Sequence, residues 1–471
     1  MRSIIAGTVL VVLLSACSST PERAPEQPPA EEQQQPQEPV LDPAAEAYES
    51  ISLAMSVGDP EEAIAAYQEA ELADPESPDT QVLLANLYVA AGQLPQAREI
   101  LNQVLDADPQ NADALYLLAL IEGSDGDEDR ERELLQQSLE VNPENAPAQA
   151  ALGEIELRNR RYDAAESAFA ASLEVDPENL VALIGLGNVK LRTDEPEQAA
   201  EILTTAIEEA PEYSFAYADR SRAWAMQYEL ESAEDDLNQA VELEPDFIWH
   251  RYDRGLIRLE RSNFTGAIDD FTSVIEEDPS IFLAYVHRAR ALDQEGERDA
   301  AIADYETALE LRPDYHPGHR PLGTLYFEDE RFGAAAEQFR AAWEDGNPND
   351  PRDPGMAMMA ALSWKMADDT ERADTFLEAA AADFPRPGLW YDMARFYLRP
   401  GYDGSILRGI EDEEDRLLQA RMRFYLAGQY EALGQTNSAR ALYLEVRDSD
   451  LRGFIETRLA RQRYERMMPA E

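Results

Sequence analysis

Cysteine and lysine are almost absent from this chain of 471 residues, and each absence narrows the class of protein. The one cysteine, Cys17, excludes an intrachain disulfide and a cysteine-based metal cluster. Lys190 and Lys365 are the only lysines, and the 40 basic residues stand against 95 acidic ones, which gives a formal net charge of −55. Because a surface this negative repels phosphate groups, the composition argues against nucleic acid as a partner.

The excess of acidic residues has two interpretations. Dense carboxylates can keep a protein hydrated in a saline habitat, where counter-ions screen their mutual repulsion. Alternatively, the negative charge can steer a basic partner towards the chain. The acidic residues are spread along the whole sequence, which favours the first interpretation.

The N-terminal apolar run, Ile4 to Leu14, follows Arg2 and is too short to span a bilayer. It ends in Leu14-Ser15-Ala16-Cys17, which resembles a bacterial lipobox. The resemblance implies that residues 1–16 are a lipoprotein signal peptide and that Cys17 is acylated after cleavage. The alternative is an ordinary secretory signal that happens to be followed by a cysteine.

The segment that follows the cysteine predicts a tether. Ser18 stands where the Gram-negative sorting rule would place an aspartate in an inner-membrane lipoprotein, so the resemblance slightly favours the outer membrane. Residues 17–43 are rich in Pro, Glu and Gln and cannot bury apolar surface. We therefore expect an extended, disordered tether between the lipid and the folded part of the chain.

Prolines recur at a constant interval through most of the chain: Pro75, Pro109, Pro143, Pro177, Pro211, Pro245, Pro279 and Pro313. Between them, each unit has two stretches with helical apolar spacing. Small residues recur in the first stretch at Gly153, Gly187, Gly255 and Gly323, and in the second at Ala97, Ala165, Ala199, Ala233, Ala267, Ala301 and Ala335. A large residue follows the alanine one helical turn later in most units. Small residues at both contact points allow two antiparallel helices to pack closely, and each proline ends a second helix.

This pattern resembles the tetratricopeptide repeat, whose unit is about 34 residues long and has the same order of small, large and proline positions. The resemblance implies an all-α, right-handed solenoid of about ten to eleven helical hairpins with a C-terminal capping helix. We expect nine contiguous units in residues 44–349 and a tenth in residues 350–387.

Residues 388–471 are less regular and predict degenerate helices, a last hairpin and a cap. We expect a helix near 389–398, a loop at the sequence RPGYDGS, a hairpin in 420–449 and a basic capping helix near 451–466. This order is similar to the C-terminal part of the new-lipoprotein-I type, bacterial lipoproteins that adapt peptidoglycan hydrolases and envelope proteases to one another.

In tetratricopeptide arrays the first helices line a concave groove, where ligands usually lie. The resemblance places ten residues of this chain in such a groove: Asn86, Arg158, Asn188, Arg192, Phe215, Arg222, Trp249, Tyr252, Arg290 and Arg320. Arginine can grip carboxylates with two hydrogen bonds, and aromatic side chains suit an extended peptide. Asn188 and Arg192 also look like half of the carboxylate clamp of some family members. The alternative is that these arginines only neutralise neighbouring acidic residues.

A second set of arginines predicts structural ion pairs. Each of these arginines precedes an aspartate by the same number of positions, and both sets recur with the period of the prolines. The pairs are Arg220 with Asp236, Arg254 with Asp270 and Arg288 with Asp304. That spacing places each pair on the facing helices of one hairpin.

The sequence offers no enzymatic constellation. His316 and His319 have the spacing of a metal-binding pair, but Pro317 and Gly318 separate them and a third ligand is missing. No glycine-rich phosphate loop follows a strand, and no nucleophile can be matched with a base. We therefore predict neither an enzyme nor a cofactor nor a metal.

Together these features predict a lipid-anchored scaffold or adaptor of the bacterial cell envelope, facing the periplasm, with the outer membrane slightly favoured. Its expected partners are envelope hydrolases, proteases, and secretion or transport components. The alternative function is an accessory protein of a transport system that binds a solute receptor or a small ligand.

Overall fold

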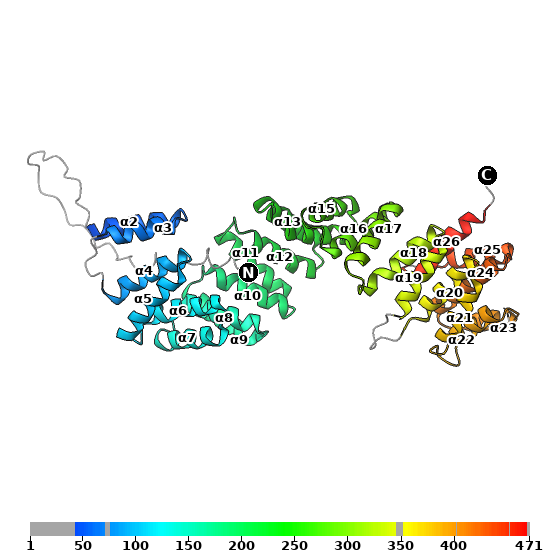
Figure 1. The fold of residues 1–471 in the computed structure, drawn as a ribbon, viewed down its shortest axis with the longest axis horizontal. Coiled ribbons are helices and arrows are strands. Elements are labelled where there is room, and N and C mark those ends of the chain that lie inside the picture. The colour runs from blue at the N-terminus through cyan, green and yellow to red at the C-terminus, as the bar shows by residue number, and fades with distance from the viewer. Residues whose placement is uncertain (1–42, 71–75, 345–351, 402, 452, 469–471) are drawn as a thin grey trace, which may run out of the picture. The chain divides into compact units, whose positions relative to one another are not determined.

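The computed structural model describes residues 43–70, 76–344, 352–401, 403–451 and 453–468. The predicted signal peptide, Cys17 and the predicted tether up to residue 42 lie outside them. The described residues form 25 α-helices and one short 3₁₀ helix and contain no strand (Figure 1), so the predicted all-α class is confirmed.

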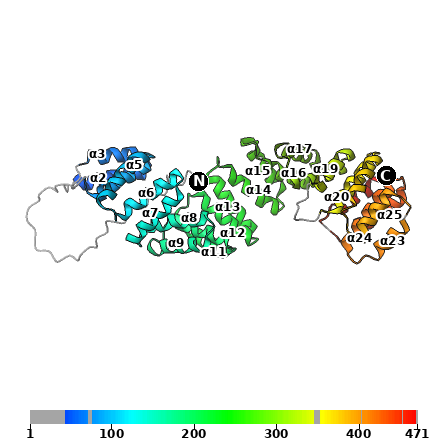
Figure 2. The same cartoon turned by 60° about the horizontal axis from the view of Figure 1, so that its bottom comes forward.

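The chain divides into two compact units, one up to Pro245 and one from Asp246. The helices of unit 1 are α2 (Pro43–Ser56), α3 (Pro60–Glu69), α4 (Pro78–Ala90), α5 (Leu94–Ala107), α6 (Ala112–Asp125), α7 (Glu128–Val141), α8 (Ala146–Arg158), α9 (Tyr162–Val175), α10 (Leu180–Arg192), α11 (Pro196–Glu209), α12 (Ser214–Met226) and α13 (Leu230–Leu243). The helices of unit 2 are α14 (Ile248–Glu260), α15 (Phe264–Glu277), α16 (Phe282–Glu295), α17 (Arg298–Leu311), η1 (His316–Gly318), α18 (His319–Glu328), α19 (Phe332–Glu344), α20 (Pro354–Met366), α21 (Thr370–Ala380), α22 (Leu389–Leu398), α23 (Asp403–Glu411), α24 (Arg416–Ala432), α25 (Thr436–Arg447) and α26 (Ile455–Arg466). From α2 to α21, consecutive helices pair as hairpins, and Figure 2 shows the same pairs from a second direction.

Glycine and a large side chain fit together where the helices of a hairpin meet. A Cβ atom added to Gly153 of α8 would lie 2.7 Å from the ring of Phe169 on α9, and the same ring also lies against Gly185 of α10. Gly187 meets Leu203, and the recurring alanines of the second helices are completely buried. One large residue therefore fills the space between two successive hairpins, which is how neighbouring repeats share a core.

The helix ends also repeat. Ser77, Asn111, Asn145 and Asn179 each accept a hydrogen bond from a backbone N–H in the first turn of the helix that follows, which caps α4, α6, α8 and α10. The second helices end shortly before the periodic prolines, as α5 does before Pro109. This confirms the predicted role of proline as a helix terminator.

The turn between the two helices of each hairpin contains a residue with positive φ. This residue stands at the same point of successive repeats, and it is glycine in some hairpins, such as Gly92 and Gly126, but Arg160, Asp194 and Tyr228 in others. Glycine adopts this backbone conformation without strain, whereas other residues lose about 1 kcal/mol.

Within each unit, first helices of neighbouring hairpins lie against one another. The contacting pairs are α4 with α6, α8 with α10, α10 with α12, and α14 with α16. Second helices make no contacts of similar extent in the described residues. Each array therefore bends towards its first helices, and we call the exposed side of these helices the first-helix face.

The end of unit 2 is a closed bundle and not an open array. Every residue of α20 from Gly355 to Lys365 is buried, because α19, α21 and α24 pack around it. Its core residues belong to one continuous hydrophobic cluster that runs from α16 to α26. In the part of the chain that the structure describes, no helix is both long and apolar enough to cross a membrane.

Two details of this bundle differ from the sequence prediction. The sequence RPGYDGS was predicted to be a loop, but α23 begins within it at Asp403. Ile406 and Ile410 of α23 are buried in the bundle, so tertiary packing stabilises a helix that its two glycines disfavour. The last helix begins at Ile455, somewhat later than predicted.

Candidate functional site

The three predicted arginine–aspartate pairs are confirmed as structural bridges inside hairpins. Arg220 donates two hydrogen bonds to Asp236, of 2.9 and 2.7 Å, and Arg288 donates two of 2.7 Å to Asp304. Arg254 binds Asp270 in the same way, at 3.0 and 2.6 Å. All three aspartates are buried, so these arginines are not available to a partner.

On the first-helix face of unit 1, Arg158 is already paired. Its guanidinium lies 3.2 Å from Glu131 and 3.8 Å from Glu128, both on α7. Glu131 reaches this face because its carboxylate lies where Gly123 has no side chain. For Arg158 the structure supports the alternative interpretation, in which the arginine neutralises neighbouring carboxylates.

Asn188 and Arg222 are brought together by a residue that the sequence analysis missed. The buried Asp219 of α12 accepts a hydrogen bond of 2.7 Å from the amide of Asn188 on α10 and one of 2.5 Å from Arg222. The spacing of Asp219 and Arg222, one turn apart on a helix, was a signal for this pair. The amide group of Asn188 is thus committed to the next repeat, so it does not form half of a vacant carboxylate clamp with Arg192.

Arg192 differs from Arg158 and Arg222. It ends α10, its side chain is exposed, and it forms no ion pair with any described residue. Phe215 is half-buried against Tyr213, with ring centroids 5.6 Å apart. Asn86 is 8% exposed, so it contributes little to the surface.

Unit 2 carries a cluster of aromatic and basic residues on α14 and α16. Trp249 is 46% exposed and packs edge-on against the buried Tyr252, with ring centroids 5.5 Å apart. Tyr252 contacts His287, whose pKa is lowered to about 4 by burial and then by the positive charge of Arg290. Arg290 is exposed and has no ion pair among the described residues.

Arg320 lies near the beginning of α18. It is exposed and forms no ion pair with a described carboxylate. The ten predicted positions therefore separate into residues committed to neighbours, buried or half-buried residues, the exposed Trp249, and three exposed arginines without ion pairs to described residues.

Glu154 is a further residue of the first-helix face that sequence reasoning missed. It is half-buried on α8, and no described residue forms a hydrogen bond or an ion pair with its carboxylate. Burial raises its pKa, although Arg158 one turn away acts in the opposite direction. Burial is the main cause of the raised pKa of Tyr116 and Tyr213, and the charge of Glu154 also contributes to it.

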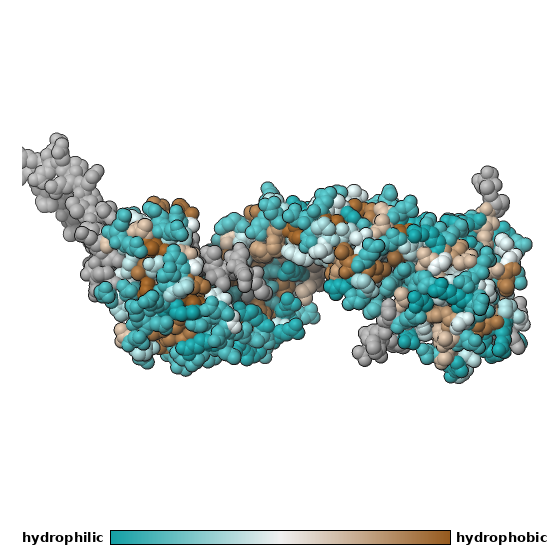
Figure 3. All heavy atoms as spheres, viewed as in Figure 1, coloured by the Kyte–Doolittle hydropathy of each residue, from teal (hydrophilic) through white to brown (hydrophobic). Residues whose placement is uncertain are grey.

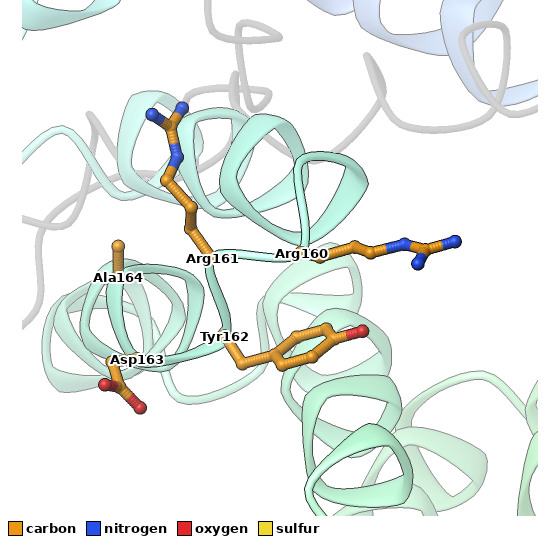
Figure 4. A pocket seen from close by; sticks show the side chains of 5 residues that line it. All are labelled: Arg160, Arg161, Tyr162, Asp163 and Ala164. Carbon is orange, nitrogen blue, oxygen red and sulfur yellow. The ribbon is translucent and has the colours of Figure 1, made fainter.

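The described residues contain no group of three histidine, cysteine, aspartate or glutamate side chains that could hold a metal ion. The Nδ1 atom of His319 lies 2.8 Å from the side-chain oxygen of Gln338. An open hollow of about 380 Å³ lies at the turn from Arg160 to Ala164. Figure 4 shows that the charged side chains of Arg160, Arg161 and Asp163 point in different directions there, so no set of polar groups converges on a ligand.

The face of the molecule drawn in Figure 3 is mainly hydrophilic, with smaller apolar areas among the described residues. Such a surface, with charged and aromatic side chains exposed on packed helices, suits contacts with other proteins.

Three solved structures illustrate the similarity to known proteins. PilF from Pseudomonas aeruginosa is 18% identical, with 44% of this chain and 95% of that chain covered and a TM-score of 0.40. A structure of MamA is 26% identical, covers 34% of this chain and 95% of its own, and has a TM-score of 0.33. A tetratricopeptide repeat protein from Parabacteroides merdae is 20% identical, with 54% and 99% covered and a TM-score of 0.40.

Comparison with models of protein families identifies the type of repeat. One model of the tetratricopeptide repeat matches residues 54–121 and 156–227, and a second matches residues 132–179 and 252–316. These stretches include helices of both units, and their hairpins have the small contact residues and terminal prolines described above. The hairpins in these stretches are therefore tetratricopeptide repeats, a fold suited to binding other proteins.

Proposed function

We propose that this chain is a membrane-anchored scaffold that binds client proteins of the bacterial cell envelope on its first-helix faces. The observation that carries the proposal is the presence of exposed arginines without described ion pairs on a very acidic chain. Arg192 lies on unit 1, and Arg290 and Arg320 lie on unit 2. Although the sequence has 95 acidic residues, these three arginines form no ion pair with a described carboxylate, so we take them to be available for a client.

The chemistry of these positions favours a client segment that carries carboxylates. A guanidinium group binds a carboxylate with two parallel hydrogen bonds and holds its orientation. On unit 2, the exposed ring of Trp249 beside Tyr252 adds apolar contact area on α14. The acidic remainder of the surface would repel acidic proteins that do not meet an arginine, which adds specificity.

The anchor and the location are part of the same proposal and rest on the sequence. The lipobox-like Leu14-Ser15-Ala16-Cys17 and the segment to residue 43 would hold the repeats at a membrane surface in the periplasm, with the outer membrane favoured. Candidate clients are hydrolases, proteases, and secretion or transport components.

The test is affinity purification of the full-length protein from detergent-solubilised envelopes, followed by binding of the recovered client to Arg192→Glu. We expect this variant to lose client binding at least tenfold, because the carboxylate would repel the client group that Arg192 grips. Its helicity and melting temperature should stay unchanged, since Arg192 is exposed and makes no described ion pair.

Arg160→Glu is the matched control. Arg160 is also exposed and also lacks a described ion pair, but it lies in the turn between α8 and α9. Equal client binding by the wild type, Arg192→Glu and Arg160→Glu would remove unit 1 from the proposal. Recovery of a transporter's solute receptor as the dominant partner would instead favour the transport accessory.

A further inference from the structure

Helix α26 is a basic element on an acidic chain. Its twelve residues, Ile455–Arg466, include four arginines. Leu459 and Ala460 are its only apolar residues that are fully buried. Leu459 and Ala460, with the partly buried Ile455 and Tyr464 beside them, join α26 to the hydrophobic cluster of the bundle, and contacts of its charged side chains add to this attachment.

Arg458 joins α26 to two helices that are distant in sequence. It donates hydrogen bonds of 2.6 and 2.7 Å to the two carboxylate oxygens of Asp293 on α16. It also donates bonds of 2.5 and 2.6 Å to the two oxygens of Glu328 on α18. One guanidinium group thus binds two carboxylates with both edges of its planar fork.

The following turns of α26 bind the end of α18 and the helix α24. Arg463 pairs with Glu431 of α24 and lies 2.6 Å from Glu330, and Arg466 lies 2.5 Å from Glu330. Arg466 and Gln462 also donate hydrogen bonds to the backbone carbonyl of Glu328, at 2.9 and 2.5 Å. They satisfy a carbonyl at the negative C-terminal end of α18, where cations are favoured.

The first turn of α26 has a separate anchor. The buried Glu456 accepts hydrogen bonds of 2.6 Å from Arg421 and 2.9 Å from the hydroxyl of Tyr425, both on α24. Glu456 therefore holds the first turn of α26 through contacts that are separate from those of the arginines from Arg458 onwards.

We call the four carboxylates of Asp293, Glu328, Glu330 and Glu431 the arginine seat. Without α26, Arg298, 3.4 Å from Glu328, is the one remaining cation with an ion pair to the seat among the described residues. Four carboxylates with one cation repel one another and attract further positive charge. The contacts at the rim are also accessible to solvent, since the side chains of Arg458 and Arg466 are 39% and 40% exposed. Glu330, the partner of Arg466, is 44% exposed, so this pair is weak and exchangeable, whereas Glu328 is only 4% exposed and holds Arg458 more firmly.

We infer that the arginine seat is a recognition surface for an arginine-bearing helix, which α26 fills in the resting chain and which a basic helix of a partner protein can occupy in exchange. This surface takes a cationic partner. It is distinct from the exposed arginines of the proposed client site, and the inference holds whether or not that site binds an acidic client.

The probe is a fluorescent synthetic peptide of residues 453–468, added to the full-length protein. In the double variant Arg458→Ala/Arg466→Ala, the protein's own α26 is held less firmly, while the seat is intact. We expect this variant to bind the peptide at least tenfold more tightly than the wild type. Adding Asp293→Asn and Glu328→Gln to it should abolish the gain. Arg461→Ala is the matched control, because Arg461 is exposed and makes no ion pair with a described residue.

The inference is overturned if the double variant stays folded and binds the peptide no better than the wild type. It is also overturned if the double variant loses the helicity of the bundle, because α26 is then an indispensable cap. Hydrogen exchange on the wild type provides a test without substitutions. Saturating peptide should accelerate hydrogen exchange of the amides in α26 beyond Glu456 but not in α25. Unchanged hydrogen exchange in α26 would contradict the replacement of α26 by the peptide.

Discussion

At the scale of single residues, Glu154 is the most unusual side chain of unit 1. Its carboxylate is half-buried without a described partner, whereas the nearby Glu131 and Asp219 are each bound by an arginine. Burial raises the pKa of Glu154, which means that folding disfavours its charged form. A buried charged carboxylate without a partner lowers the free energy of unfolding. Side chains with shifted pKa values often occur at binding surfaces.

Replacing Glu154 by Gln should therefore stabilise the protein by about 1 kcal/mol at pH 7, because the amide carries no charge to desolvate. The folded-state pKa of Glu154 lies above its unfolded value, so the penalty is fully present at pH values above the folded pKa. The gain should disappear as the pH falls through the folded-state pKa and below the unfolded-state pKa, where the carboxyl is protonated in both states. Urea unfolding at pH 7 and pH 4 measures both quantities.

Glu156→Gln is the control for this prediction on the same helix. Glu156 is also buried, but it lies 3.3 Å from Arg132 and accepts a hydrogen bond of 3.2 Å from Arg161. Its replacement should destabilise the protein at pH 7. Equal effects of the two substitutions would show that the missing partner of Glu154 has no energetic consequence.

Sequence alone could not separate the committed arginines from the available ones. Arg158 and Arg192 occupy equivalent positions in successive repeats. Arg158 is neutralised because Gly123 leaves space for Glu131 to reach it from the preceding hairpin. That contact depends on side chains from α6, α7 and α8 together, so no local pattern around Arg158 predicts it.

At the scale of helices and hairpins, the arginine–aspartate bridges fix how the two helices of a hairpin pack. Arg288 on α16 binds Asp304 on α17 and donates a further hydrogen bond of 3.1 Å to Thr272 on α15. The hydrogen bond to Asp304 stabilises the charged guanidinium and so raises the pKa of Arg288. The bridge therefore connects three consecutive helices and sets their relative positions.

Asp304→Leu should destabilise this part of unit 2 by about 3 kcal/mol, because it leaves the guanidinium of Arg288 partly buried without its carboxylate. The double variant Arg288→Met/Asp304→Leu should recover at least half of that loss, since no charge is then left unpaired. Hydrogen exchange of the amides in α16 and α17 measures the change locally. A double variant as unstable as the single one would mean that the bridge itself, and not the orphaned charge, carries the stability.

The hairpins were predictable because the same physical requirements recur in every repeat. A helix pair needs small residues at its contact points, and a proline marks its end. The same small residues and prolines therefore recur in each unit and predict the same hairpin. The spacing of Arg220 and Asp236 likewise revealed the bridges. Helix α23 was not predictable, because Gly404 and Gly409 oppose a helix and only the surrounding bundle stabilises it. The contacts of Arg458 with the arginine seat join residues that are 130 and 165 positions apart, beyond any local pattern.

At the scale of the whole molecule, the predicted anchor determines where the repeats act. Cys17→Ser should prevent acylation, because serine lacks the thiol that a lipoprotein signal supplies. We expect the wild type to partition into the detergent phase of a Triton X-114 extraction and the variant to remain in the aqueous phase. Helicity should be equal, since the described helices begin at residue 43. A wild type found in the aqueous phase would contradict the proposed attachment.

The enclosure of α20 has a consequence for how such a chain can change in length. An array with an open end gains or loses whole repeats there, because each new hairpin needs only one neighbour. Beyond α19 this freedom is absent, since α20 is already surrounded by α19, α21 and α24. Duplication or deletion of a single module is therefore compatible with the fold among the earlier hairpins, while the helices from α19 onwards are inherited, or transplanted into another protein, as one piece.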